Sequence, residues 1–375
     1  MAKAPDPGFV VDFPTIWAVP YWIEAHCPVP DGFRQGEQLE LYPWQLWCTV
    51  NHYRVRPTAC VGQQSTAFRY RRSQVVAPQK TGKGPWSATI VLAEACGPVV
   101  FAGWAAGGER YRCADHGCAC GWWYEYEPGE RMGRPWATPL IQLTATSEDQ
   151  VANVYRPLQA MVKLGPLGDR LKVGEEFIRI GSRGRIDVVT SSARSRLGNP
   201  INFALQDETG TWTKENKLLG VADTQRRGVS GMSGRSMETT NSWDPSESSV
   251  AQLTAASKQD DIFRYHPQAP KSLSYGYKRQ RRKIHAVVYA VGAARRSPRR
   301  EISRSGRASR RGVRRYPGGR IRTPSSTRSL RGSRIVVTTR PACPAAVRRT
   351  KRNSRTFTLF TECQRSWRNA TARLS

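Results

Sequence analysis

The chain has 375 residues and a formal net charge of +30, which is unevenly distributed. Residues 1–270 contain 29 Lys and Arg against 27 Asp and Glu, whereas residues 271–375 contain 30 against two. The nine Cys lack the dense pattern of a disulfide framework, and no apolar run is long enough to cross a bilayer. We therefore expect an intracellular globular enzyme and not a secreted or membrane protein.

The expected elements form one α/β domain over residues 39–270. Residues 1–38, rich in Pro and aromatic residues, are expected to be irregular, and Pro43 predicts the first turn of a short helix over residues 41–48. Beyond this helix, strands alternate with helices, which is typical of a parallel sheet with covered faces. The expected strands are residues 73–77, 98–104, 140–146, 177–180, 186–190, 201–206 and 237–241, and the expected helices are residues 86–96, 147–165, 213–225 and 246–257.

Two segments depart from this pattern. Residues 105–136 are rich in Gly, Cys and aromatic residues and are interpreted as an insertion. Residues 271–375 are dominated by Arg, Ser, Gly and Pro, a composition that cannot bury enough apolar surface to offset the entropy of ordering. We therefore expect a basic, disordered tail, and such a tail would bind nucleic acid through its charge.

A candidate phosphate-binding loop follows the strand over residues 73–77. Gly allows backbone N–H groups to point inward, and one Lys can reach the β- and γ-phosphates of a nucleotide, so Gly82 and Lys83 supply the centre of such a loop. The loop residues expected to bind the nucleotide are Thr81, Gly82, Lys83 and Gly84.

The loop departs from the usual pattern at two positions. Ala77 stands where the first Gly is expected, and Gly84 stands where the Mg²⁺-binding Ser or Thr is expected. Thr81 and Ser87 are candidates for the missing hydroxyl. A Gly-rich surface turn without function is the alternative interpretation.

An Asp-Glu pair ends the apolar strand expected over residues 201–206. Such a strand places both carboxylates at the carboxyl edge of the sheet, where Asp207 would hold Mg²⁺ through water and Glu208 would polarise the attacking water. Two solvated acids at a strand end are the alternative. We expect the phosphate loop and the Asp-Glu pair to follow neighbouring strands of one parallel sheet. The two motifs together predict ATP hydrolysis.

These two motifs and four further segments resemble the large subunit of tailed-bacteriophage terminases, the motor that packages DNA into the capsid. The four segments are residues 41–45, 144–150, 191–198 and 238–241. The resemblance implies a P-loop, RecA-like ATPase fold of the additional-strand class, working as a homo-oligomeric ring with ATP and Mg²⁺. It also implies double-stranded DNA, a terminase small subunit and the portal of the procapsid as partners, in the cytoplasm of the bacterial host.

The resemblance also implies roles for individual residues. Gln45 matches the residue that contacts adenine, and Lys80 matches the basic residue early in the phosphate loop. The motif that couples loss of the γ-phosphate to movement of the DNA-gripping parts matches Thr239, Thr240 and Asn241. Arg196, as well as Arg194, is a candidate for the positive charge that stabilises the transferring phosphoryl group, although either could be a solvated loop residue.

The family also carries an RNase H-like nuclease domain with a cluster of Asp residues and two metals. Residues 271–375 contain no Asp, so we do not expect nuclease activity from this chain. We interpret the tail as the product of translation out of frame or of a truncated gene, with a DNA-binding arm as the alternative.

A Cys-rich cluster in the insertion is a candidate zinc site. Its four soft ligands are Cys113, His116, Cys118 and Cys120. Zinc sites usually contain ligand pairs two to four residues apart that a longer loop separates, and Cys118 and Cys120 are closer than that. A surface insertion with reduced thiols is the alternative, and His26 is assigned no role.

Two functions are therefore expected. The first is an ATPase motor of a terminase. The second is a catalytically inactive, truncated terminase or a non-enzymatic protein that binds nucleic acid through its basic tail.

Overall fold

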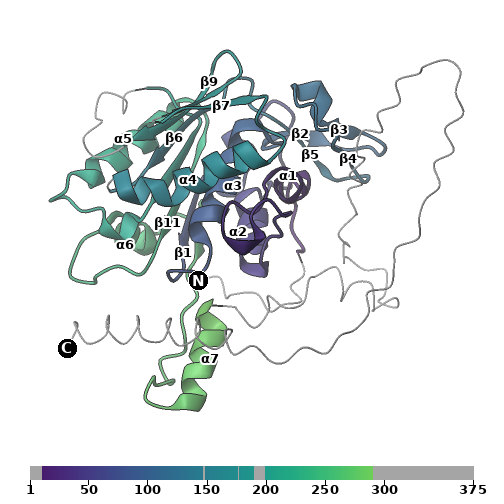
Figure 1. The fold of residues 1–375 in the computed structure, drawn as a ribbon. Coiled ribbons are helices and arrows are strands. Elements are labelled where there is room, and N and C mark those ends of the chain that lie inside the picture. Colours follow the sequence, from purple (N-terminus) through teal and green to yellow (C-terminus); the bar gives the residue numbers. More distant parts are fainter. Residues whose placement is uncertain (1–10, 147, 176, 190–198, 290–375) are drawn as a thin grey trace, which may run out of the picture. The chain divides into compact units, whose positions relative to one another are not determined.

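The computed structural model describes residues 11–146, 148–175, 177–189 and 199–289. Its centre is an eight-stranded sheet in the order β12-β1-β11-β10-β6-β9-β8-β7 (Figure 1). The strands from β12 to β9 run parallel, whereas β8 and β7 continue the sheet in antiparallel pairing. The strands are β1 (Arg72–Val76), β6 (Leu140–Thr144), β7 (Leu171–Val173), β8 (Phe177–Ile180), β9 (Gly184–Val189), β10 (Phe203–Asp207), β11 (Arg235–Thr240) and β12 (Ile262–Tyr265).

Helices cover both faces of this sheet. On one face α2 packs against β1 and β12, and α3 packs against β6, β9 and β10, with α1 and α4 lying on α3. On the other face α5 packs against β10 and β11, and α6 packs against β1. The helices are α1 (Ala18–His26), α2 (Pro43–His52), α3 (Lys83–Cys96), α4 (Glu148–Leu164), α5 (Leu218–Gly231), α6 (Val250–Ala256) and α7 (Lys278–Tyr289).

The burial pattern of the strands follows from this arrangement. Phe203 and Leu205 of β10 face the main core, while Ala204 between them packs on the opposite side with Ile201 and Val229. Since successive side chains of a strand alternate in direction, a strand buried on both faces reads as a continuous apolar run. The predicted α/β class with a parallel central sheet is therefore confirmed.

The expectation that residues 1–38 are irregular is wrong for residues 18–26. These residues form α1, and Ile16, Trp22 and Ile23 are buried in the same core as the central strands. Pro20 does not prevent the helix, because it lies in the first turn, where backbone N–H groups have no intrahelical acceptor. The described part of this segment, residues 11–38, thus belongs to the packed domain.

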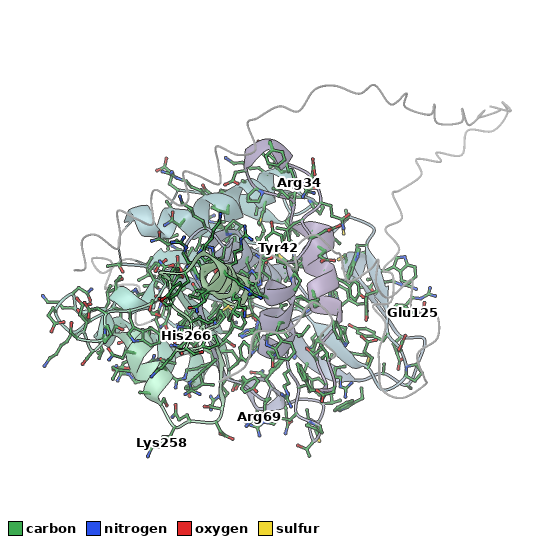
Figure 2. All side chains as sticks on the ribbon, turned by 90° about the horizontal axis from the view of Figure 1, so that it is seen from below. Arg34, Tyr42, Arg69, Glu125, Lys258 and His266 are labelled. Carbon is green, nitrogen blue, oxygen red and sulfur yellow. The ribbon has the colours of Figure 1, made fainter. Side chains whose placement is uncertain are left out.

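The insertion and the strand before it form two small antiparallel sheets beside the main one (Figure 1). The strand expected over residues 98–104 is β2 (Val100–Trp104), but it pairs with β5 (Arg131–Arg134) outside the central sheet. A hairpin of β3 (Arg110–Arg112) and β4 (Trp123–Glu125) lies between them in sequence. Glu125, labelled in Figure 2, pairs with Arg110 across this hairpin at 2.7 Å.

The end of the domain also differs from expectation. Strand β12 extends the sheet beyond β1 and was not expected, and α6 begins later than the helix expected over residues 246–257. Helix α7 lies in the tail that we expected to be disordered, so that expectation is wrong for residues 278–289. Residues 290–375 lie outside the described part of the chain. Within the described residues, no helix has the length and apolar character needed to span a membrane.

Candidate nucleotide site

The candidate phosphate loop connects β1 to α3. β1 ends at Val76 and α3 begins at Lys83, so the loop turns the chain from the carboxyl edge of the sheet into a helix N-terminus. Gly82 makes this turn with a φ of +88°, a conformation that suits Gly because a Cβ there is strained. The backbone N–H groups at the start of α3 and its dipole favour an anion at this position.

Lys83 is buried at the start of α3, with only 8% of its surface exposed. Its Nζ donates hydrogen bonds to the Ala77 carbonyl oxygen (2.9 Å) and to Asn241 Oδ1 (2.6 Å). Glu208 Oε1 lies 3.9 Å from the same Nζ. Burial lowers the pKa of Lys83, and the negative charges of Glu208 and Asp207 oppose that shift. The ammonium group is thus held between the loop and the acidic strand.

The phosphate loop and the acidic pair do not lie on neighbouring strands, contrary to our expectation. β11 lies between β1 and β10 and pairs in parallel with both. In this register Thr239 aligns with Val75 on one side and with Asp207 on the other. The end of β11 is therefore placed between the two motifs. This inserted strand is the additional strand of the predicted P-loop fold.

Asp207 is the buried member of the acidic pair, with 4% of its surface exposed. Its Oδ1 accepts a hydrogen bond from Thr239 Oγ1 at 2.6 Å. Burial raises the pKa of Asp207 to about 6; the Thr239 hydrogen bond opposes this shift, and the neighbouring Glu208 charge adds to it. A cation beside Asp207 would stabilise its ionised form.

Glu208 follows β10 in a left-handed conformation, with a φ of +56°. Its carboxylate accepts hydrogen bonds from Asn241 Nδ2 at 3.0 Å to each oxygen, and from the Asn241 backbone N–H at 3.3 Å. Such a backbone conformation is uncommon for a residue other than Gly and is frequent at functional sites. Asn241 therefore fixes the direction of the Glu208 carboxylate and also contacts Lys83.

Thr240 joins the same end of β11 to the two flanking loops. Its carbonyl oxygen accepts from the Ala77 backbone N–H at 3.1 Å, and its Oγ1 accepts from the Gly210 N–H at 2.9 Å. Three consecutive residues therefore contact different parts of the site. Thr239 contacts Asp207, Thr240 contacts both loops, and Asn241 contacts Lys83 and Glu208. The end of β11 and the residue that follows it therefore connect the phosphate loop to the acidic pair.

Gln45 also lies beside the phosphate loop. Its Nε2 donates to the Gly82 carbonyl oxygen at 3.3 Å, and its Oε1 accepts from the Tyr42 N–H at 2.9 Å. Both ends of the amide are therefore engaged, one with the loop and one with the start of α2. Thr81 Oγ1 donates to the Pro78 carbonyl oxygen (2.8 Å), and Lys80 is exposed with a φ of +62°.

The packing of α3 against α4 explains the unusual residue at position 84. A Cβ on Gly84 would lie 2.5 Å from the Asn153 carbonyl oxygen of α4, far closer than real Cβ contacts. A Ser or Thr therefore does not fit here without moving α4. One turn later, Ser87 Oγ is buried with no hydrogen-bond partner among the described residues.

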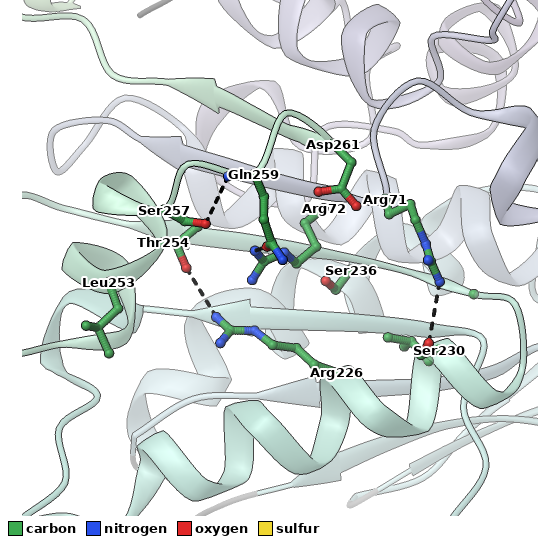
Figure 3. A pocket seen from close by; sticks show the side chains of 12 residues that line it. Arg71, Arg72, Arg226, Ser230, Ser236, Leu253, Thr254, Ser257, Gln259 and Asp261 are labelled. Carbon is green, nitrogen blue, oxygen red and sulfur yellow. Dashed lines mark hydrogen bonds between the residues drawn. The ribbon is translucent and has the colours of Figure 1, made fainter.

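Arg196 and the rest of the loop over residues 190–198 lie outside the described residues. A basic pocket does occur elsewhere, at the amino ends of β1 and β11, and Figure 3 shows Arg71, Arg72 and Arg226 lining it. Arg226 donates to Thr254 Oγ1 (3.2 Å) in this pocket. Lys83 follows the opposite end of β1, so the pocket is separate from the candidate nucleotide site.

The strand order and the β1–loop–α3 unit define an additional-strand P-loop ATPase fold. The structure is similar to the crystal structure of the HK97 bacteriophage large terminase, with a TM-score of 0.50 and 18% sequence identity over 78% of this chain and 52% of that one. The predicted terminase-type fold is therefore confirmed.

Sequence comparison finds two phage proteins, and the chain aligns with only a small part of each. The chain is 27% identical to the gene 13 protein of Mycobacterium phage D29 over 200 residues, and 29% identical to that of Mycobacterium phage L5 over 146 residues. These alignments cover 52% and 39% of this chain but only 30% and 21% of the relatives. No protein-family profile matches the chain.

Proposed function

We propose that this chain is the ATP-hydrolysing motor part of a phage terminase large subunit, which drives double-stranded DNA into a capsid. The observation that carries this proposal is the double contact of Asn241, which binds Lys83 through Oδ1 and Glu208 through Nδ2. The terminase-type fold supports it. Partners proposed by the same argument are DNA, a small subunit, the portal, and further copies of the chain in a ring.

In this mechanism the residues of the site have separate tasks. Lys83, which donates to the Ala77 carbonyl oxygen, would contact the β- and γ-phosphates of bound ATP, and the N-terminus of α3 would favour their negative charge. Glu208 orients the attacking water and accepts its proton. Asn241 accepts a hydrogen bond from Lys83 and donates one to Glu208. If Lys83 turns to a phosphate, Asn241 loses its contact with Lys83 and can shift the Glu208 carboxylate.

Magnesium fits the acidic half of the site. Asp207 is a buried carboxylate whose pKa is raised to about 6 by its burial, and a divalent cation beside it would relieve that cost. When bound, Mg²⁺ would neutralise charge on the phosphates. Asp207 is the residue that we assign to it, through water, with Thr239 fixing the carboxylate.

A second candidate function follows from Gly84. The usual Mg²⁺-binding hydroxyl is absent at this position, and α4 leaves no room for one. The chain could therefore bind ATP without hydrolysing it, as an inactive terminase remnant. Arg196 remains a proposed source of positive charge in the active alternative.

Binding and turnover of ATP separate these candidates. In the active case, Lys83→Ala weakens binding of a fluorescent ATP analogue at least tenfold, while Glu208→Gln retains binding and loses at least a hundredfold in turnover. Glu215→Gln is the matched control, because Glu215 is an exposed acid in the same region. Equal turnover by the Glu208 and Glu215 variants would exclude Glu208 from the chemistry.

A further inference from the structure

Four metal-ligating side chains, one from α1 and three from the insertion, meet in the fold. His26 comes from the last position of α1, and Cys113, Cys118 and Cys120 come from the connection between β3 and β4. Their ligand atoms all lie within 4.8 Å of one another. His26 Nε2 is 3.2 Å from Cys120 Sγ and 3.3 Å from Cys113 Sγ.

The histidine in this cluster is not the one that the local spacing indicated. His116 is not a member of the group; its ring stacks on Tyr111 with a centroid distance of 4.8 Å. His26, to which the sequence assigned no role, takes the fourth place. Zinc sites usually combine closely spaced ligands with ligands that are distant in the sequence, and His26 supplies the distant ligand here.

Helix α1 fixes the orientation of the His26 ring. Its Nδ1 lies 2.8 Å from the Trp22 carbonyl oxygen, so Nδ1 carries the proton and Nε2 presents its lone pair to the thiols. The ring also stacks on the Trp22 indole, at 4.3 Å between centroids. A histidine that donates its second N–H to a carbonyl is the usual arrangement of a metal ligand.

The chain around the cysteines is folded to bring the sulfurs together. Cys113 begins a 3-10 turn that Gly117 ends with a φ of +78°, and the Cys118 N–H then donates to the Cys113 carbonyl oxygen at 3.0 Å. The Trp122 N–H points at Cys120 Sγ, 3.4 Å away. An N–H donor of this kind stabilises the negative charge of a thiolate.

We propose that His26, Cys113, Cys118 and Cys120 bind one structural Zn²⁺ in a closed tetrahedral site. Zn–S bonds of about 2.3 Å and a Zn–N bond of about 2.0 Å place tetrahedral ligands roughly 3.5–3.8 Å apart, and the observed cluster needs only small shifts to reach this geometry. His26 and Cys113 are each only 1% exposed, as expected for a structural rather than a catalytic site.

The site would fasten the insertion to α1. α1 packs against α3, and the first residue of α3 is Lys83. By stabilising α1, the metal would therefore also stabilise the helix that follows the phosphate loop. It takes no part in hydrolysis. Its test is therefore independent of ATP turnover.

The test is the zinc content of the full-length chain, purified from zinc-supplemented cells and measured by mass spectrometry of the metal. We expect about one zinc per chain in the wild type, in His116→Ala, and in Cys60→Ser, a matched control with an exposed thiol. His26→Ala and Cys118→Ser should lose most of the metal, and His26→Cys should retain it. Zinc loss in His116→Ala but not in His26→Ala would overturn the assignment.

Substituting Co²⁺ in the wild type keeps the test independent of variants that fail to fold. Three thiolates on tetrahedral Co²⁺ give an intense sulfur-to-metal charge-transfer band, which we expect to see and to disappear on adding excess Zn²⁺. A wild-type chain that holds neither zinc nor thiolate-bound cobalt would refute the site.

Discussion

Replacing Gly84 by Ala tests why the phosphate loop lacks its usual hydroxyl residue. The added Cβ would lie 2.5 Å from the Asn153 carbonyl oxygen, and α3 and α4 must separate by about 0.5 Å before this contact reaches even 3.0 Å. The obstacle is backbone, so it cannot rotate away as the end of a side chain could. Overpacking of this kind costs about 1–3 kcal/mol, while replacing Gly by Ala in a helix returns about 0.5–1 kcal/mol.

The net expectation for Gly84→Ala is a loss of about 0–2.5 kcal/mol in the free energy of unfolding, centred near about 1 kcal/mol, which lowers Tm by a few degrees. Gly220→Ala is the matched control, because Gly220 lies in α5 and a Cβ added there would meet nothing within 4 Å, so we expect it to be neutral or slightly stabilising. Urea unfolding followed by circular dichroism measures both. A Gly84→Ala chain as stable as the control would refute the packing argument.

Two other predictions concern the polar network. Asn241→Ala removes the contacts to Glu208 and Lys83. In steady-state kinetics it should lower ATP turnover about tenfold to a hundredfold with little change in ATP binding. A parallel loss of ATP binding would contradict a role of Asn241 in orienting Glu208. Asp207 has a folded-state pKa raised to about 6, so the native state holds its proton more tightly than the unfolded state, and the free energy of unfolding should fall as pH rises from about 4 to 6. Asp207→Asn removes this pH dependence. Above pH 6 and without Mg²⁺, its free energy of unfolding in urea melts should exceed that of the wild type by up to about 3 kcal/mol. A difference between the two proteins that does not change with pH would contradict this prediction.

The sequence predicted the local parts of this fold well. β10 begins with the apolar run Phe203–Leu205, β1 and β11 each end in two β-branched residues, and α3 follows a Gly that permits the turn. Such signals depend on neighbours in the chain, so they can be read without the tertiary structure. The fold class followed from their alternation together with the motifs.

The sequence did not predict how these parts are ordered in space. The position of β11 between β1 and β10 depends on how the chain crosses over the sheet, which no local pattern records. The apolar residues of α1 do not indicate a helix by themselves, because Pro20 and the aromatic residues around it are also typical of irregular segments. β12 is a short edge strand of four residues, too short for a clear periodicity.

The same limit applies to the sites. Lys83, Asp207 and Glu208 could be singled out by residue type and by their place after a strand, but the contacts of Asn241 with two of them could not. His26 lies 87 residues before Cys113, so spacing alone favoured His116, which is nearer in the chain. Tertiary structure decides which histidine meets the thiols.

The most direct test of the central claim is ATP turnover by the full-length chain with and without double-stranded DNA, beside Glu208→Gln. We predict that the wild type hydrolyses ATP, that DNA increases the rate, and that Glu208→Gln abolishes turnover in both conditions while ATP still binds. Intact ATP binding by the wild type without turnover, in the presence or absence of DNA, would contradict the motor function and favour an inactive remnant.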